Sequence, residues 1–337
     1  GLFISKKISK PIIISNNKFL LNINKIKNNF LIMSQSNFVN YLIKIKINLL
    51  EIQYKYSNFD IYKTLSKNIK IINTKIKIDK KISQKTTNEV KNINLCHIED
   101  GLSLTRFILN FKKNKSLTNE YLIANYLYQI RKEGINFFCN SFDYISAIDH
   151  NAAIVHYKPT RLKSKKLLSP SILLIDSGAH YLEGTTDVTR VIKLNSLKFR
   201  NIKKYYTYLL KSLILIETTE FTKGVSGSDL DSFIRNYLSN FNIYYGHGTG
   251  HAVGYFNDVH EKYPILSPNS NDKILNNNLF SIEPGFYLNN KFGLRIENLY
   301  FSKIRNDKIK LFNTTLVPYD LSLIDWRLIL NKEKKFI

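Results

Sequence analysis

Two aspartates in the second half of the chain stand where their carboxylates could meet. In the segment LLIDSGAHYLEGTTDVTRVI, four apolar residues lead into Asp176, and Asp187 opens a second strand-like run. Gly178 and Gly184 lie between the two runs and would let the chain turn back. If the runs form paired strands, both carboxylates can reach one ion. Aspartate is also common in turns, so this segment alone leaves a purely structural role open.

Three histidines gather in the glycine-rich segment YYGHGTGHAVGYFNDVHE. They are His247, His251 and His260, out of seven histidines in the whole chain. The glycines between them would let backbone segments approach closely while the imidazoles face a common space. A single histidine is usually structural, but three in this setting favour a functional cluster.

Two glutamates follow in the segments LFSIEPGFY and FGLRIENLY. Glu283 precedes a Pro-Gly pair, which predicts a carboxylate at the end of a strand, held by a fixed turn. Glu297 is expected inside a strand over 294–300, where glutamate is rare unless it is paired or binds metal. Arg295 shares a face with Glu297 by the strand period of two, so a plain ion pair between them is the alternative.

Together these segments supply four carboxylates and one imidazole to a candidate metal centre. Such an oxygen-rich set suits hard or borderline ions such as Mn²⁺ or Co²⁺ better than a thiolate-seeking ion. Two divalent ions would offset the four carboxylates, and a bridging hydroxide would keep the site near neutral. The expected metal ligands are Asp176, Asp187, His251, Glu283 and Glu297.

Amphipathic helices and short strands should position these residues. Apolar spacing predicts helices over 37–50, 90–110, 117–133 and 201–220, and another from an N-cap at Ser228 to about Leu238. Strands are expected over 11–15, 70–78, 146–157 and 171–176, followed by short strands and turns from 279 to 316. Helices lead and strands carry the polar residues, which predicts an α+β fold.

The composition excludes several classes of protein. Apolar residues make up 44% of the chain, which argues against disorder, and no apolar run approaches the roughly 18 residues of a membrane span. The net charge of +24 comes from lysines spread among Ile and Asn, as in IKIKIN, so we expect a solvated basic surface and no nucleic-acid partner. Cys96 and Cys139 are too few for a disulfide framework and are expected to be reduced thiols of a cytoplasmic protein.

The chain is expected to contain two domains. Residues 1–80 hold short β-branched runs without a catalytic cluster, which predicts a partial small α/β domain. Residues 81–337 are expected to form the catalytic domain. The start, GLFISKKISKPIII, lacks an initiating Met and a clear targeting segment, so we expect it to lie inside a longer gene product.

The motifs DSGAHY, GTTDVTR, HGTGH, SIEPGFY and GLRIEN together resemble the aminopeptidase P family, which consists of Xaa-Pro aminopeptidases with the pita-bread (creatinase/aminopeptidase) fold. The likeness runs from about Asn88 to the end, and NEVKNINLCHIEDGLSLTRFIL resembles the helix that opens the family's catalytic domain. It implies metal-dependent removal of the N-terminal residue from peptides with proline at the second position. Two ions are expected, Mn²⁺ first, with Co²⁺ or Zn²⁺ as alternatives.

Carried over by position, the resemblance implies a role for each metal ligand. Asp176 would bind one metal, and Asp187 and Glu297 would bridge both. His251 and Glu283 would complete the other site.

The resemblance also implies catalytic roles outside the ligand set. His156, in AAIVHYKP, and His260 would line the substrate pocket and steady the tetrahedral intermediate. His247 would hold a further active-site position, and Arg295 would orient a metal-binding carboxylate. Glu283 would carry a proton from the attacking water to the leaving proline nitrogen.

The chain departs from the family in ways that leave some questions open. Ala252 replaces the usual glycine after HGTGH, and Val191 stands where threonine commonly follows DVTR. Residues 1–80 are expected to match at most the latter part of the family's leading domains, which support dimers, so a homodimer is expected with the oligomeric state left open. Prolidase, which splits only Xaa-Pro dipeptides on the same scaffold, is the nearest alternative. A catalytically silent pita-bread binding module is the alternative of another class.

Overall fold

The computed structural model describes residues 2–3, 10–14, 30–52, 54, 59–73, 78–111, 113–114, 116–167 and 170–337. The chain divides into two compact units, Gly1–Lys77 and Ile78–Ile337, each with its own hydrophobic core. None of the helices in the described part of the chain combines the length and apolar character needed to cross a bilayer.

The leading unit is a small α/β arrangement. Its elements are β1 (Leu2–Phe3), β2 (Ile12–Ile14), β3 (Leu31–Met33), α3 (Gln35–Lys44), β4 (Leu49–Ile52), α4 (Phe59–Leu65) and β5 (Lys70–Asn73). Strand β2 pairs with β1 in antiparallel and with β3 in parallel orientation, and β4 pairs with β5 in parallel. Phe38 and Leu42 of α3 pack with Leu65 and Ile69 in a core of their own.

Two predictions for the leading unit need correction or restriction. The helix expected over 37–50 ends at Lys44, because Lys46 takes a left-handed backbone with φ of 50° and the chain then enters β4. The strands expected over 11–15 and 70–78 are present at Ile12–Ile14 and Lys70–Asn73, while residues 15 and 74–77 lie outside the described part.

The larger unit contains five described α-helices, three before its first strand and two between later strands. Its helices are α5 (Ile78–Ile82), α6 (Thr87–Phe111), α7 (Glu120–Lys132), α8 (Ile202–Thr218) and α9 (Gly227–Ser239), and short 3₁₀ segments lie at Asp149–Ala153 (η2), Leu321–Leu323, Trp326–Leu328 and Asn331–Phe336. The four predicted helices in this unit are confirmed, with ends shifted by a few residues. Helix α9, however, is capped by Ser226 rather than Ser228, because Ser226 and Asp229 form a reciprocal capping box.

The strands of the larger unit form four mostly antiparallel sheets. Their bounds are β6 (Phe137–Asn140), β7 (Ile145–Ile148), β8 (Ile172–Ser177), β9 (Ala179–Tyr181), β10 (Gly184–Thr185), β11 (Val188–Lys193), β12 (Phe221–Thr222), β13 (Gly250–Ala252), β14 (Glu261–Leu266), β15 (Leu279–Ile282), β16 (Gly285–Leu288), β17 (Phe292–Arg295), β18 (Asn298–Arg305) and β19 (Lys308–Asn313). The strand orders are β12-β19-β18-β15-β13-β14, β11-β8-β7, β10-β9-β6 and β16-β17. The α+β prediction is confirmed.

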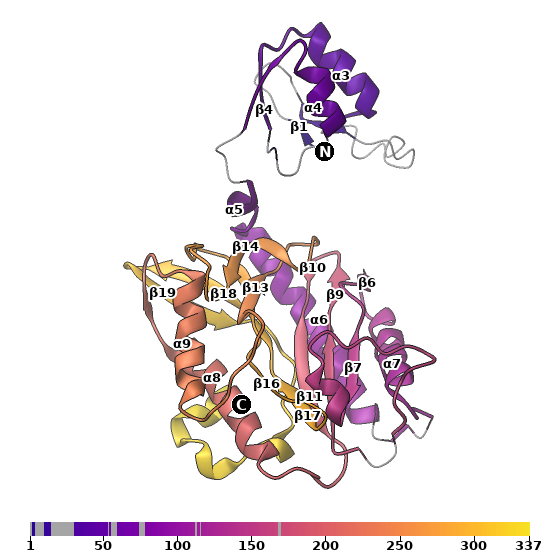
Figure 1. Ribbon diagram of the computed structural model, residues 1–337, viewed down its shortest axis with the longest axis vertical. Coiled ribbons are helices and arrows are strands. Elements are labelled where there is room, and N and C mark those ends of the chain that lie inside the picture. The colour runs from indigo at the N-terminus through magenta and orange to yellow at the C-terminus, as the bar shows by residue number, and fades with distance from the viewer. Residues whose placement is uncertain are drawn as a thin grey trace. The chain divides into compact units, whose positions relative to one another are not determined.

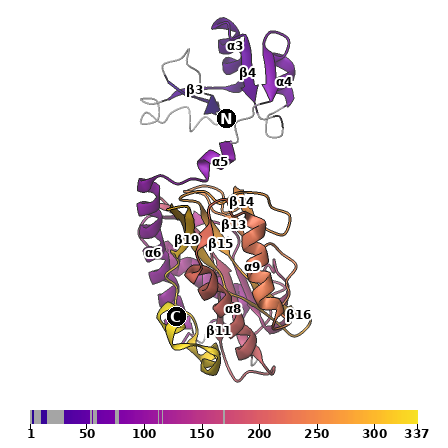
Figure 2. The same cartoon turned by 90° about the vertical axis from the view of Figure 1, so that its left-hand side faces the viewer.

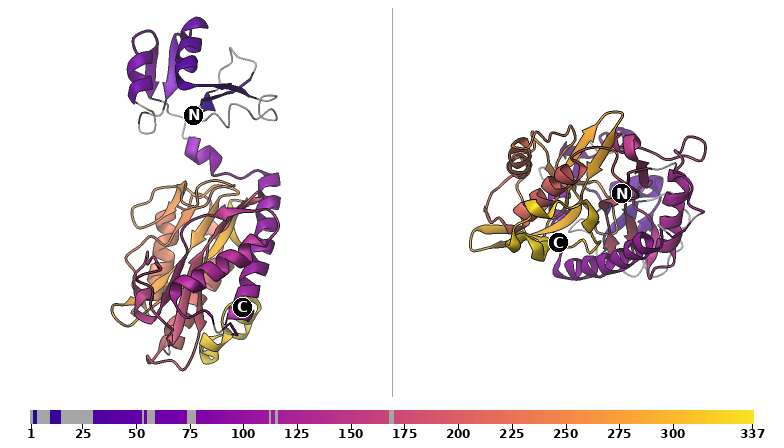
Figure 3. Two further views of the ribbon diagram at one scale, coloured as in Figure 1. Left: turned by 90° about the vertical axis from the view of Figure 1, so that its right-hand side faces the viewer. Right: turned by 90° about the horizontal axis from the view of Figure 1, so that it is seen from below.

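Two pairs of helices cover the strands from outside. Leu104 and Phe107 of α6 and Ile123 and Leu127 of α7 pack against β7, β8 and β11, as the purple and magenta helices of Figure 3 (left) show. Helices α8 and α9 pack on the side formed by β15, β18 and β19, seen in Figure 2. The strands of the larger unit thus have α6 and α7 packed on one group of strands and α8 and α9 on another (Figure 1).

The strand expected over 146–157 is much shorter in the structure. It ends at Ile148, because Asp149 adopts a left-handed backbone with φ of 46° and starts η2. The rest of the predicted strand belongs to a long connection that reaches β8. This connection carries His156 to the site.

Candidate metal centre

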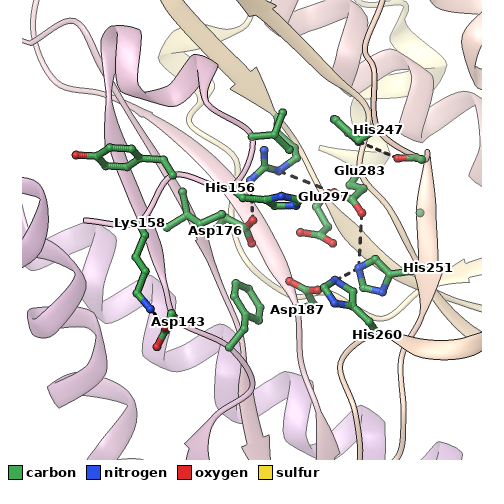
Figure 4. A pocket seen from close by; sticks show the side chains of 17 residues that line it. Asp143, His156, Lys158, Asp176, Asp187, His247, His251, His260, Glu283 and Glu297 are labelled. Atoms are coloured by element: carbon green, nitrogen blue, oxygen red, sulfur yellow. Dashed lines mark hydrogen bonds and ion pairs between the residues drawn. The ribbon is translucent and has the colours of Figure 1, made fainter. Parts of the chain in front are cut away.

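All nine residues singled out in the sequence line one cavity of about 550 Å³ in the larger unit. Figure 4 shows most of these side chains pointing toward a common centre from different strands and loops. The nine are His156, Asp176, Asp187, His247, His251, His260, Glu283, Arg295 and Glu297.

The two aspartates come from the paired strands β8 and β11. Asp176 lies in β8 opposite Thr189, and Asp187 comes immediately before β11. Gly178 does not make the turn that was expected between them. It is required by a close approach instead, because an added Cβ would lie 2.0 Å from the Thr186 carbonyl oxygen. This contact draws the two chain segments together at the point where both carboxylates emerge.

Each aspartate has a buried oxygen that lacks a partner in the described part of the chain. These oxygens are Oδ1 of Asp176 and Oδ1 of Asp187. A buried carboxylate oxygen without a hydrogen bond is costly, so such oxygens favour a bound cation. The site therefore fits a metal on this observation.

His251 extends from β13 toward the aspartates. Its Nδ1 lies 3.1 Å from the Ala252 carbonyl oxygen, which can only accept, so Nδ1 carries the proton. The Nε2 atom then faces Asp187 Oδ2 at 3.5 Å and Glu283 Oε1 at 3.6 Å. A histidine fixed in this way by its second nitrogen is the usual arrangement of a metal ligand.

The two glutamates close the cluster from the other sheet. Glu283 directly follows β15, and its amide donates to the Thr249 carbonyl at 2.8 Å. Glu297 lies between β17 and β18 rather than inside a strand as predicted, and its Oε2 accepts from the Thr189 hydroxyl at 2.8 Å. One ligand atom each of Asp187, His251 and Glu297 lie within 4.8 Å of one another.

Burial and mutual repulsion disturb the acid cluster. Burial raises the pKa of Asp187 and of Glu297 well above the ordinary value, and the neighbouring carboxylates raise both further. Burial also raises the pKa of Glu283, although His251 and Arg295 partly offset that rise. Divalent cations would supply more positive charge than Arg295 alone provides to this cluster.

Arg295 is the buried cation of the site, and it pairs with Asp176. Its Nη2 lies 2.6 Å from Asp176 Oδ2, and its Nε donates to the Thr189 hydroxyl at 3.2 Å. The simple ion pair with Glu297, considered from the sequence, is replaced by these contacts. Arg295 thereby fixes one oxygen of Asp176 and leaves Oδ1 free for a cation.

Tyr287 joins Arg295 to His247, a role that was not predicted from the sequence. His247 Nδ1 faces the Gly248 carbonyl at 2.8 Å and must donate, so Nε2 accepts from the Tyr287 hydroxyl at 2.9 Å. That hydroxyl in turn accepts from Arg295 Nη1 at 3.0 Å. Burial lowers the pKa of His247 to about 4, which keeps the ring neutral. The only available signal was an aromatic residue four positions after Glu283.

The other two histidines lie on connections rather than strands. His156 follows η2, and His260 directly precedes β14. The His260 ring stands edge-on to the His251 ring with centroids 4.2 Å apart, and burial lowers its pKa. Both imidazoles border the space next to the acid cluster, where a substrate would enter (Figure 4).

Comparison with known sequences connects this site to characterised chemistry. A model described as metallopeptidase family M24 matches residues 91–302. A probable Xaa-Pro aminopeptidase P of Podospora anserina is 38% identical over 265 residues, which are 74% of this chain and 39% of the relative. One of Pyrenophora teres f. teres is 34% identical over 290 residues, 82% of this chain and 44% of the relative. The chain spans about two fifths of the length of these curated relatives.

The backbone of the chain also superposes on solved structures. An X-prolyl aminopeptidase from Caenorhabditis elegans, described as a cytosolic enzyme with a di-nuclear active site, superposes with a TM-score of 0.81 at 26% identity over 98% of this chain and 56% of its own. An X-Pro aminopeptidase from Thermotoga maritima gives 0.76 at 21%, covering 93% and 87%. An Xaa-Pro dipeptidase from Bacillus anthracis gives 0.78 at 22%, covering 95% and 88%. The last two likenesses concern the fold alone.

Proposed function

The chain belongs to metallopeptidase family M24 and has its pita-bread fold, and from this premise we propose that it is an Xaa-Pro aminopeptidase. The observation that carries the proposal is the cluster of four carboxylates and His251 in one cavity, in which Asp176, Asp187 and Glu297 are buried. The proposed substrates are peptides with proline at the second position, and the bond cleaved is the one before that proline.

Five side chains would hold two divalent cations. They are Asp176, Asp187, His251, Glu283 and Glu297. Mn²⁺ is the proposed ion, with Co²⁺ and Zn²⁺ as alternatives, because oxygen ligands and one imidazole suit this group of ions. When bound, the ions supply Lewis-acid chemistry to the scissile carbonyl and to a water molecule.

The remaining steps belong to the protein's own groups. Glu283, held by its amide at Thr249 and flanked by His251, takes a proton from the attacking water and returns it to the proline nitrogen. His156 and His260 donate hydrogen bonds to the carbonyl oxygen as negative charge develops on it. A bond before proline has no amide N–H, so recognition must come from the shape of the cavity rather than from a backbone donor.

The wider context of the enzyme is also part of the proposal. We assign residues 78–337 to the catalytic domain, beginning three residues before the sequence-based boundary, since Lys80 of α5 lies over the Tyr263 ring. The leading residues would be part of a preceding domain. A cytoplasmic location agrees with the description of the Caenorhabditis elegans relative, and a homodimer without nucleic acid remains the proposed assembly.

Prolidase is the second candidate, because a dipeptidase shares the fold with a TM-score of 0.78. The higher identity to relatives named aminopeptidase P favours the first candidate. The two activities differ in the substrate length that they accept. An aminopeptidase cleaves Xaa-Pro-Xaa peptides, whereas a prolidase cleaves only Xaa-Pro.

Release of the first amino acid from an Xaa-Pro-Xaa tripeptide tests the proposal. The purified chain with Mn²⁺ should release that residue, and a chelator should stop the reaction. An Asp187→Asn variant should be inactive while keeping its circular dichroism spectrum. Cleavage of dipeptides alone would support prolidase, and absence of both activities and of bound metal would support a silent binding module.

A further inference from the structure

Glu120, the first residue of α7, is a fully buried carboxylate outside the cavity. Its exposed fraction is 0%, and it lies one residue after the helix cap Asn119. The oxygens of Glu120 accept hydrogen bonds from four uncharged groups. The donors are Ile148 N at 2.7 Å, Asn151 Nδ2 at 3.0 Å, Tyr157 OH at 2.6 Å and Lys165 N at 2.8 Å.

These donors lie along one connection, residues 148–165, which we name the His156 loop. The first donor is the last residue of β7, the second lies in η2, the third follows His156, and the fourth is the end of the loop. Four consecutive residues of this loop line the cavity, namely Val155, His156, Tyr157 and Lys158. One carboxylate therefore fastens the beginning, middle and end of the segment that presents His156.

The contact with Tyr157 connects Glu120 to the site most directly. Tyr157 is the neighbour of His156, and its ring packs against the buried core while its hydroxyl reaches Glu120. Anchoring position 157 fixes the backbone on which the His156 ring is mounted. Burial and the hydrogen bond to Glu120 raise the pKa of the Tyr157 hydroxyl, which therefore stays protonated as a donor.

The charge of Glu120 suits this position. It occupies the first turn of α7, where the helix dipole favours an anion. Four donors of this kind replace the water that an exposed carboxylate would bind. Glutamine has the same size, but its amide group would face donors, so at least one of the four contacts would be lost.

We propose that Glu120 is a positioning residue that acts through Tyr157 to hold His156 toward the cavity. This inference rests on the proposed aminopeptidase function for its kinetic test. The alternative is a purely structural role, in which Glu120 stabilises the fold without any specific effect on His156.

A double-mutant cycle separates these two roles. Glu120→Gln should lower kcat/KM for an Xaa-Pro-Xaa peptide at least tenfold, mainly through kcat. In the His156→Ala background, the same change should cost less than about twofold, because the residue on which it acts is gone. Tyr157→Phe, which removes one donor and is less disruptive, should show the same non-additivity with a smaller loss.

Glu333→Gln is the matched control, since Glu333 pairs with Lys211 at 2.9 Å and does not line the cavity. It should leave kcat unchanged in both backgrounds. Equal losses from Glu120→Gln with and without His156 would overturn the proposal. So would full activity of both Glu120→Gln and Tyr157→Phe.

Hydrogen exchange tests the inference independently of activity. Because glutamine keeps only one acceptor oxygen, at least one of the Ile148 and Lys165 amides should exchange about tenfold faster in Glu120→Gln than in the parent or in Glu333→Gln. Unchanged exchange at both amides would overturn the proposed anchoring. If the parent chain cleaves no Xaa-Pro peptide, the proposed function fails, but this comparison still decides the role of Glu120.

Discussion

At the scale of single residues, the site holds more negative than positive side chains. The cluster brings together four carboxylates and the His251 imidazole, and the one guanidinium among the described residues that line the cavity, that of Arg295, pairs with Asp176. Negative charge is buried in this cluster. It is visible in the oxygens of Asp176 and Asp187 that have no hydrogen-bond partner in the described part of the chain. It is also visible in the raised pKa values of Asp187 and Glu297. A pair of divalent cations would relieve both.

His247 gives a prediction for stability against pH. Its pKa is about 4 in the folded protein against an ordinary value of about 6.5, so the unfolded chain binds the proton first. The stability that depends on the neutral ring is therefore complete above pH 6.5 and is lost as the pH falls toward 4.

Chemical denaturation from pH 7 to 4, with chelator present, measures this dependence. The free energy of unfolding of the parent should fall on the order of 2 kcal/mol more than that of His247→Gln, a figure reduced for the partial exposure of the ring. Parallel curves for the two proteins would contradict the assigned contacts of His247.

The residue types predicted most of the candidate ligands, but not the hydrogen bonds that hold them in place. Four carboxylates and the histidines were found because Asp, Glu and His are informative in glycine-rich or strand contexts. Tyr287, Thr189 and Glu120 were missed, because tyrosine, threonine and a glutamate at a helix start have common structural roles. Their importance lies only in contacts between segments far apart in the sequence, such as Thr189 with Glu297.

At the scale of helices and strands, the close approach of β13 and β15 positions His251. A Cβ added to Gly250 would lie 1.9 Å from the Ser281 carbonyl oxygen, and the His251 amide donates to the Ser281 hydroxyl at 3.0 Å. A larger residue at position 250 must therefore push the two strands apart.

Gly250→Ala should weaken metal binding at least tenfold, because His251 moves with β13. The measurement is titration of Mn²⁺ into the chelator-treated protein by calorimetry. Gly246→Ala is the matched control in the same segment, since an added Cβ there meets nothing within 4 Å. Equal Mn²⁺ affinity of the two variants would show that the strand approach does not position the ligand.

Helices were easier to predict than strands for a physical reason. Apolar spacing near 3.6 extends over many residues, so α6, α7 and α8 were found with small errors at their ends. Only the first three residues of the strand predicted over 146–157 lie in β7, since a local left-handed residue, Asp149, ends the strand. Glu297 was predicted inside a strand because β17 and β18 are separated by only two residues. Such a short interruption leaves the alternation of polar and apolar residues in the sequence unchanged.

At the scale of the whole molecule, the two halves of the larger unit meet at the proposed metal centre. Strands β8 and β11 are covered by α6 and α7, and strands β13 and β15 belong to the sheet covered by α8 and α9. Each half contributes some of the five proposed ligands, so neither half holds the proposed set alone. The proposed centre therefore depends on the packing of the whole larger unit.

Anomalous diffraction from crystals of the Mn²⁺-loaded protein tests the central claim most directly. Two peaks are expected inside the cavity, among the side chains of Asp176, Asp187, His251, Glu283 and Glu297 that would hold the ions. Mn²⁺ located outside this cavity, or a cavity without any peak at saturating Mn²⁺, would contradict a metallopeptidase centre built from these five residues.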